Sequence, residues 1–171
     1  MSNFASRFFL AIVLACLCMQ PARAATPAVN ATATTALLHP ISIIKRYDLD
    51  FGYIAAGATA GTVVIDPNTD TASATGGAIL IGGDPHAAAF IGAAGSSNVV
   101  NIKVPRQPVT LTRSGGTETM TATKFTVEGL DKRNVARLVA FEFRVGATLN
   151  VGANQPEGIY VGTFDVTVQY P

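Results

Sequence analysis

Cysteine is nearly absent from this chain, and both copies, Cys16 and Cys18, lie within its first 24 residues. If that stretch is removed, no thiol remains, which excludes disulfides, thiolate metal sites and a cysteine nucleophile. Tryptophan is missing altogether, and histidine occurs only twice, as His39 and His86. A domain of this composition must take its stability from a hydrophobic core.

Charge is also scarce, since Asp, Glu, Lys and Arg make up 13% of the sequence and the formal net charge is +1. No segment concentrates basic residues as nucleic-acid-binding proteins do, so we expect no nucleic-acid partner. When Arg7 and Arg23 leave with a signal peptide, 12 basic residues become 10 against 11 acidic ones. The low charge favours a secreted β domain or a packed surface polymer.

Residues 1–24 are predicted to be a cleaved signal peptide. A positive residue precedes the apolar run at 8–17, and Ala22 and Ala24 occupy the positions that a signal peptidase requires to be small. The run is shorter than the roughly 20 residues that span a membrane, so we expect no span in the mature chain. Lipidation of Cys16 is the alternative. The protein is therefore expected in the periplasm, at the cell surface or in the medium.

The remaining chain is dominated by short alternating segments. Residues 25–35 are small and polar, which predicts a flexible N-terminal arm, and Val29, Ala31 and Ala33 alternate there with Asn and Thr. Over residues 36–171, strand-like segments are separated by turn formers, and a period of 3.6 residues is lacking. We predict a single all-β domain, an immunoglobulin-like β-sandwich, with a closed small barrel as the alternative.

The clearest alternation predicts a final strand over residues 159–170. Its apolar face consists of Tyr160, Gly162, Phe164, Val166, Val168 and Tyr170. A period of two indicates that a face is buried, without indicating what it is buried against. The face can pack inside a complete sandwich, or it can accept a strand from another chain.

Several short motifs resemble the domain-of-unknown-function family DUF4402, whose members are secreted bacterial proteins. They are PISI at 40–43 followed by DLDFG at 48–52, Leu111 and Thr112 ahead of Gly115, Gly116 and Met120, VGATL at 145–149, and residues 158–170. The resemblance covers roughly residues 36–171. It implies a secreted protein and, as the family's name concedes, no established activity.

A more distant similarity is to pilin subunits of the chaperone–usher class and to spore coat U-like proteins. Gly158, Tyr160, Gly162 and the penultimate Tyr170 carry it. This resemblance implies an incomplete, pilin-like sandwich that the N-terminal arm of the next subunit completes, with a periplasmic chaperone as a partner. The chain departs from that pattern because it lacks a disulfide and because its arm residues are smaller.

The remaining motifs do not predict a metal, catalytic or phosphate-binding site. The spacing of Asp66, Asn68 and Asp70 resembles the start of a calcium loop, but Thr71 and Gly77 stand where its Gly and bidentate Glu should be. That departure favours a hairpin turn. No zinc-ligand spacing, nucleophile elbow or phosphate-binding loop is present in the sequence. We therefore expect no enzyme activity, no metal and no cofactor.

Two function hypotheses follow. The first is an exported structural or adhesive subunit of a cell-surface filament or coat, assembled by β-strand donation to further copies or to other pilus-type subunits. In it, Val29, Ala31 and Ala33 would form the donor arm and the apolar face of the final strand would be the acceptor. The second is a monomeric secreted module that binds a glycan or a protein.

Overall fold

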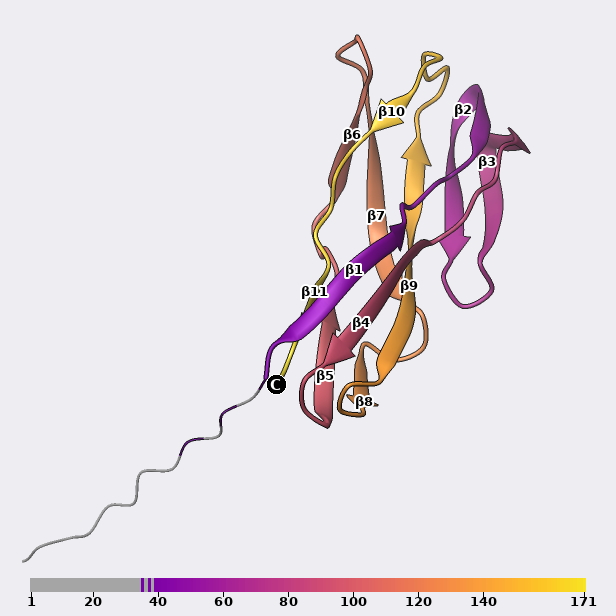
Figure 1. The fold of residues 1–171 in the computed structure, drawn as a ribbon. Helices are drawn as coiled ribbons and strands as arrows, with labels where there is room; N and C mark the ends of the chain where they lie inside the picture. Colours follow the sequence, from indigo (N-terminus) through magenta and orange to yellow (C-terminus); the bar gives the residue numbers. More distant parts are fainter. Residues whose placement is uncertain (1–34, 36, 38) are drawn as a thin grey trace, which may run out of the picture. The chain divides into compact units, whose positions relative to one another are not determined.

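The computed structural model describes residues 35, 37 and 39–171, and Leu37–Pro171 form one compact unit (Figure 1). All regular structure in this unit is β-strand, which confirms the predicted all-β fold. No helix among the described residues is long and apolar enough to cross a membrane. The strands are β1 (Ile41–Tyr47), β2 (Tyr53–Asp66), β3 (Thr71–Gly82), β4 (Ala88–Ala94), β5 (Asn98–Lys103), β6 (Val109–Arg113), β7 (Thr119–Val127), β8 (Lys132–Val135), β9 (Ala140–Val151), β10 (Tyr160–Val161) and β11 (Thr167–Gln169).

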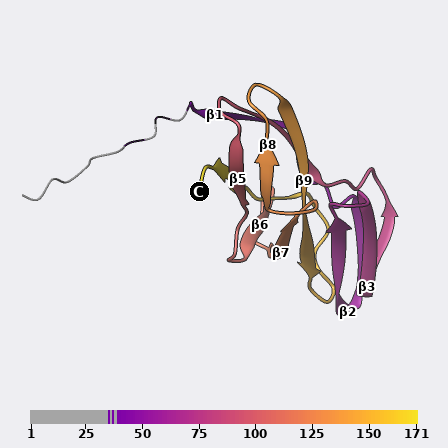
Figure 2. The same ribbon diagram turned by 90° about the horizontal axis from the view of Figure 1, so that it is seen from below.

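Two antiparallel sheets form a sandwich-like arrangement. The larger sheet has the order β1-β4-β9-β7-β6-β10, and the β2–β3 hairpin joins it through β9. The smaller sheet has the order β11-β5-β8. Viewed from below, β8 and β9 lie between β5 and the hairpin (Figure 2). This arrangement leaves β1, β3, β8, β10 and β11 as edge strands.

The long strand β9 organises the larger sheet because it changes partner along one edge. Residues 140–145 pair with β4, and residues 148–151 pair with β2. Its opposite edge pairs with β7 over residues 145–150. Gly146 lies at the change of partner, where a Cβ atom would collide with the Ile65 carbonyl. Glycine is therefore needed for the close approach of β2 to β9.

The core consists mainly of side chains from β2, β4, β7 and β9. Phe143 is fully buried, and its ring stacks on Phe90 at a centroid distance of 5.2 Å. A smaller cluster gathers around Ala94, Val100 and Val135 between the two sheets. Its partly buried neighbours are Ile41, Phe141, Val168 and Tyr170.

The opposite face of the larger sheet includes a band of uncharged polar side chains. One row runs in register across β3, β2, β9, β7 and β6 and consists of Thr75, Thr62, Asn150, Thr121 and Thr110. The Asn150 amide nitrogen donates to the carbonyl and the hydroxyl of Thr121 and to the hydroxyl of Thr123. Cross-strand polar pairs of this kind stabilise a solvent-facing sheet.

The final strand differs from the sequence prediction. Residues 159–170 form two short strands in different sheets, with residues 162–166 between them outside any strand. β10 pairs with residues 112–113 of β6, and β11 pairs with residues 101–103 of β5. The eight residues 104–111 therefore oppose only the five residues 162–166. A ladder cannot stay in register across that mismatch, and Pro105 and Pro108 also lack an N–H to donate.

Candidate functional site

Residues 162–166, here called the open segment, have unpaired backbone. Within the described part of the chain, none of their N–H or C=O groups takes part in a backbone hydrogen bond. Backbone polar groups that lack partners at the margin of a sheet are the usual template for strand addition. The open segment therefore offers five residues of free hydrogen-bonding capacity.

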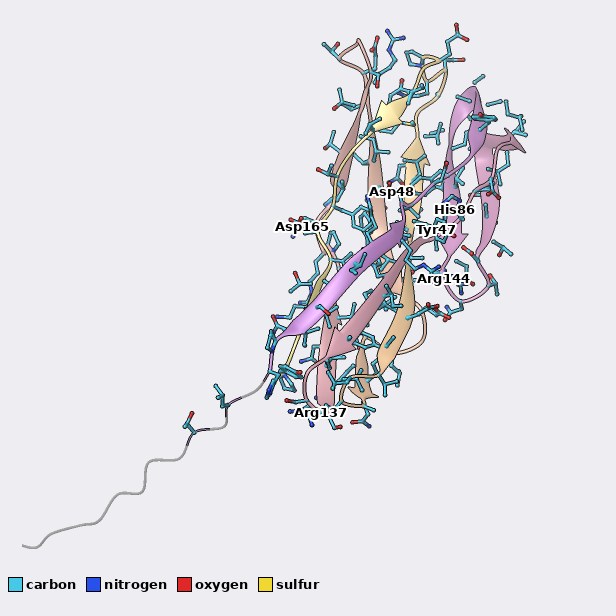
Figure 3. All side chains as sticks on the ribbon, in the orientation of Figure 1. Tyr47, Asp48, His86, Arg137, Arg144 and Asp165 are labelled. Carbon is cyan, nitrogen blue, oxygen red and sulfur yellow. The ribbon has the colours of Figure 1, made fainter. Side chains whose placement is uncertain are left out.

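Side chains, rather than backbone hydrogen bonds, hold the open segment against the domain. Phe164 and Val166 are half-buried and pack against the main core, whereas Thr163 and Asp165 are exposed. The ring of Phe164 lies 5.0 Å from that of Phe125. Asp165 points away from the body of the domain (Figure 3). The segment thus has an apolar side on the core and a backbone without hydrogen-bonded partners among the described residues.

Two strands next to the open segment also have an unpaired edge. β11 pairs only with β5, and β1 pairs only with β4. The two strands lie beside each other (Figure 1), without a ladder between them. Ile44, on β1, is a large apolar side chain with 66% of its surface exposed. We call β1, the open segment and β11 together the open edge of the domain.

Tyr170 ends the open edge with an unsatisfied polar group. Its ring packs against the small cluster that also includes Ile41 of β1 and Val168 of β11. Its hydroxyl is buried and has no hydrogen-bond partner among the described residues. A buried hydroxyl without a partner destabilises a fold by about 1–3 kcal/mol.

The predicted acceptor residues divide into two groups. Phe164, Val166, Val168 and Tyr170 follow one another along the open edge. Tyr160 instead belongs to its own loop, since its hydroxyl donates to the Pro156 carbonyl and accepts from the Gln155 amide, at 2.8 Å each.

Gly162 lies against β6 at the start of the open segment. A Cβ atom at this position would lie 2.6 Å from the Thr110 carbonyl oxygen. The space beside the glycine is therefore filled by β6 and offers no socket to a foreign side chain. The predicted donor residues Val29, Ala31 and Ala33, the cleavage residues Ala22 and Ala24, and Cys16 lie outside the described residues.

A second concave surface, here called the polar groove, was not predicted from the sequence. It has a volume of about 620 Å³ and lies between β1, β4, β9 and the β2–β3 turn. The Arg144 guanidinium lies 3.6 Å from a carboxylate oxygen of Asp70 and 3.6 Å from one of Glu128. Arg46 donates to Glu142 at 3.1 Å. Four carboxylates, including that of Asp84, thus line the groove against two guanidiniums, which leaves it with an excess of negative charge.

One wall of the polar groove is aromatic. Tyr47 and His86 meet edge to face, with ring centroids 6.1 Å apart, close to Arg144 (Figure 3). The lining residues come from positions between 46 and 144, on strands and loops that are distant in sequence. No local motif joins them, so neither alternation nor motif spacing indicates this groove in the sequence.

The calcium-like spacing at 66–70 belongs to the β2–β3 hairpin turn, as predicted. The Asn68 backbone N–H and side-chain amide both donate to Asp66, at 2.9 and 3.0 Å, and these bonds lower the pKa of the Asp66 carboxyl. Asp70 has a positive φ of 54° and accepts from the Ala87 N–H at 2.8 Å. Within the described residues, no group of three His, Cys, Asp or Glu side chains is placed to hold a metal ion.

Comparisons with known proteins give one match. A family model described as a domain of unknown function, DUF4402, matches residues 41–170, which is nearly all of the compact unit. No curated protein and no solved structure matches the chain. The family resemblance seen in the sequence is thereby confirmed, and the match assigns no activity.

Proposed function

This chain belongs to the DUF4402 family of domains of unknown function, and we propose that it is an exported subunit of a cell-surface filament or coat. In this proposal, subunits assemble by β-strand donation at the open edge. The single observation that carries it is the open segment, in which unpaired backbone and half-buried apolar side chains occur together. Strand addition uses both features, since the main chain supplies hydrogen bonds and alternate side chains supply packing.

The donor in this proposal is the N-terminal arm of another copy. Residues 25–35 can extend over about 36 Å at roughly 3.3 Å per residue, and residues 162–169 need only about 26 Å. Val29, Ala31 and Ala33 would face the domain, and Asn30, Thr32 and Thr34 would face solvent. Small donor side chains suit this edge, because Phe164 and Val166 already occupy much of its apolar side.

The buried hydroxyl of Tyr170 supports the same proposal. A donated strand between β1 and β11 brings peptide N–H and C=O groups to an edge where this hydroxyl has no partner. Because a lone domain must bear the cost of that unsatisfied group, assembly would relieve it. A sandwich complete in itself would not be expected to leave this group unpaired.

The proposal is tested by comparing residues 25–171 with residues 36–171. Light scattering after gel filtration should give oligomers for the longer form and monomers for the shorter one. A synthetic peptide of residues 25–35 should bind the shorter form and raise its melting temperature. If both forms are equally stable monomers and the peptide does not bind, strand donation is wrong.

A matched pair of arm variants makes this test sharper. Ala31→Asp places a charge on the side of the arm that faces the domain, so it should abolish assembly. Thr32→Asp introduces the same charge one residue later, on the solvent side, and should leave assembly intact. Equal effects of the two substitutions would contradict an in-register donated strand.

A secreted binding module is the second candidate function, and the polar groove favours it. The exposed ring of Tyr47 can stack on a sugar ring, and the Arg144 guanidinium, 3.6 Å from carboxylate oxygens of Asp70 and Glu128, can donate to sugar hydroxyls. A glycan array probed with the monomeric protein, with Tyr47→Ala as the comparison, distinguishes this candidate. Specific binding that Tyr47→Ala removes, by a protein that never oligomerises, would favour it over the filament subunit.

A further inference from the structure

A second, larger cleft adjoins the open edge, since Lys103 in its lining pairs with Thr167 of β11, but it has no lining residue in β1, the open segment, β11 or the polar groove. It has a volume of about 1060 Å³ and is formed by β5, the segment after β5, the middle of β7 and the start of β8. We call it the basic cleft, because four of its lining side chains are cationic. These are Lys103, Arg106, Lys124 and Lys132.

Among the residues that the structure describes, the cations of the basic cleft form no ion pair and no side-chain hydrogen bond. Most other Lys and Arg side chains of the described residues form ion pairs, and Arg133 instead donates to backbone carbonyls. Five side chains in the described part do neither, and four of them line this cleft, with Arg137 as the fifth. Unpaired positive charge is therefore collected at one place.

This concentration stands out because the domain as a whole is nearly neutral. Without Arg7 and Arg23, the 12 basic residues of the chain become 10, against 11 acidic ones. Asp131 is the only carboxylate that lines the basic cleft. Like charges that share a cleft repel one another, and their field attracts anions from solution.

The backbone of β7 helps to place one of these cations, Lys124, at the cleft. The pairing of β7 with β9 shifts register between Thr123 and Thr126, and Lys124 lies in this bulge with a positive φ of 49°. A bulge redirects the side chain that it contains, and a positive φ is unfavourable for lysine. The strand thus keeps an unfavourable conformation at the residue that brings a cation to the cleft.

We propose that the basic cleft binds a linear acidic polysaccharide. Three of its four cations are lysines, which act as point charges and lack the planar fork with which arginine matches a single phosphate or carboxylate. Spaced point charges suit a chain with one negative charge on each sugar. Val104 and Leu130 lie among the cations and offer apolar contacts to the C–H faces of sugar rings.

Nucleic acid and membrane fit this cleft less well. Single strands bind by stacking bases on exposed aromatic rings. Phe125, the only aromatic residue of the lining, is 9% exposed and packs against Phe164. Binding to a bilayer surface needs a broad apolar face, whereas Leu130 is the only strongly exposed large apolar side chain of the lining.

The test is a titration of the secreted protein, residues 25–171, with alginate oligomers, a linear polyuronate. Binding should be detected by calorimetry at 50 mM salt and should weaken severalfold at 200 mM salt. Neutral dextran should not bind. Absence of alginate binding at low salt would overturn the proposal, and so would tighter binding of oligo-dT or of phosphatidylglycerol vesicles.

Charge-matched variants locate the site. Lys132→Gln should weaken alginate binding by about threefold, and combination with Lys124→Asn, which tolerates the positive φ, by about tenfold. Arg137→Gln removes an equally unpaired cation outside the cleft and should have no effect. An equal loss of alginate affinity with Arg137→Gln would mean that the binding is nonspecific charge attraction, and it would overturn the proposal.

Failure of this proposal can be distinguished from failure of strand donation. No residue of the open segment lines the basic cleft. Deletion of residues 25–35 should therefore leave the alginate affinity per domain unchanged, whatever it does to assembly. An affinity that disappears with the arm would place the polyanion elsewhere and contradict the assignment to this cleft.

Discussion

The ring of Phe164 lies 5.0 Å from the ring of Phe125, centroid to centroid, and is tilted by 43°. This contact joins the open segment to β7 at a place where the backbone supplies no hydrogen bond. Between β10 and β11, the C-terminal part of the chain is thus attached to the domain by side-chain packing alone.

Replacing Phe164 with Ala should lower the free energy of unfolding by about 2 kcal/mol, less than for a fully buried Phe. The physical reason is the loss of a half-buried ring from the only aromatic contact of the open segment. Urea denaturation followed by circular dichroism measures the change. Thr163→Ala, at the exposed neighbour, should stay within about 0.5 kcal/mol of the parent protein.

Backbone amides of residues 162–166 should exchange with deuterium rapidly in the monomer, because they lack hydrogen-bond partners. Amides of β9, which is paired along both edges, should be protected and provide the internal reference. In the assembled protein the open segment should become protected. Slow exchange of the open segment in the monomer would contradict the unpaired backbone.

Tyr170→Phe should stabilise the arm-deleted protein by about 1 kcal/mol, because it removes a buried hydroxyl that has no partner. The gain is measured by comparing the urea denaturation midpoints of residues 36–171 with and without the substitution. In the form that carries the arm, the gain should shrink, since a donated strand would supply a partner. A loss of stability in the arm-deleted form would mean that the hydroxyl is already hydrogen-bonded.

Asn150→Ala should destabilise the domain by about 1–2 kcal/mol, because the amide of Asn150 donates to three acceptors on β7. Thermal unfolding of the variant measures the loss. Thr110→Ala, at the exposed end of the same row, is the matched control and should be nearly neutral. Similar losses for both variants would argue against a specific role of the Asn150 amide.

Acid stability should depend on Asp66, whose pKa is lowered by the Asn68 backbone N–H and then by the Asn68 side chain. A depressed folded-state pKa contributes stability that is complete above the unfolded-state value of about 3.9 and is lost as the pH falls through the folded-state value. The Asp66→Asn variant should therefore be less stable than the parent protein at pH 7. The free energies of unfolding of the two proteins should become equal at acid pH. Denaturation at several pH values tests this, and equal stabilities of the two proteins at pH 7 would contradict it.

Much of the fold could be predicted from local patterns. Alternation along the last residues indicated that Phe164 and Val166 face inward and that Thr163 and Asp165 face solvent, and their exposures follow this order. The turn at 66–70 was equally predictable, because Asp and Asn form such turns with their own side chains. Both features depend on residues close together in sequence.

The division of the final strand could not be predicted in this way. A uniform alternation from Tyr160 to Tyr170 gives no sign that the first part pairs with β6 and the last part with β5. The break arises from the unequal lengths of the two opposing segments, 104–111 and 162–166. That mismatch arises only when β10 has paired with β6 and β11 has paired with β5.

By itself, the sequence determined the all-β class, the family and the side of residues 164–170 that faces inward, since these follow from composition, motifs and a period of two. Only the tertiary structure decided which backbone groups stay unpaired and which charges come together. Hydrogen-bond partners depend on register between distant strands, and the lysines at 103, 124 and 132 become neighbours only when β5, β7 and β8 surround one cleft. Both proposals depend on that second kind of information.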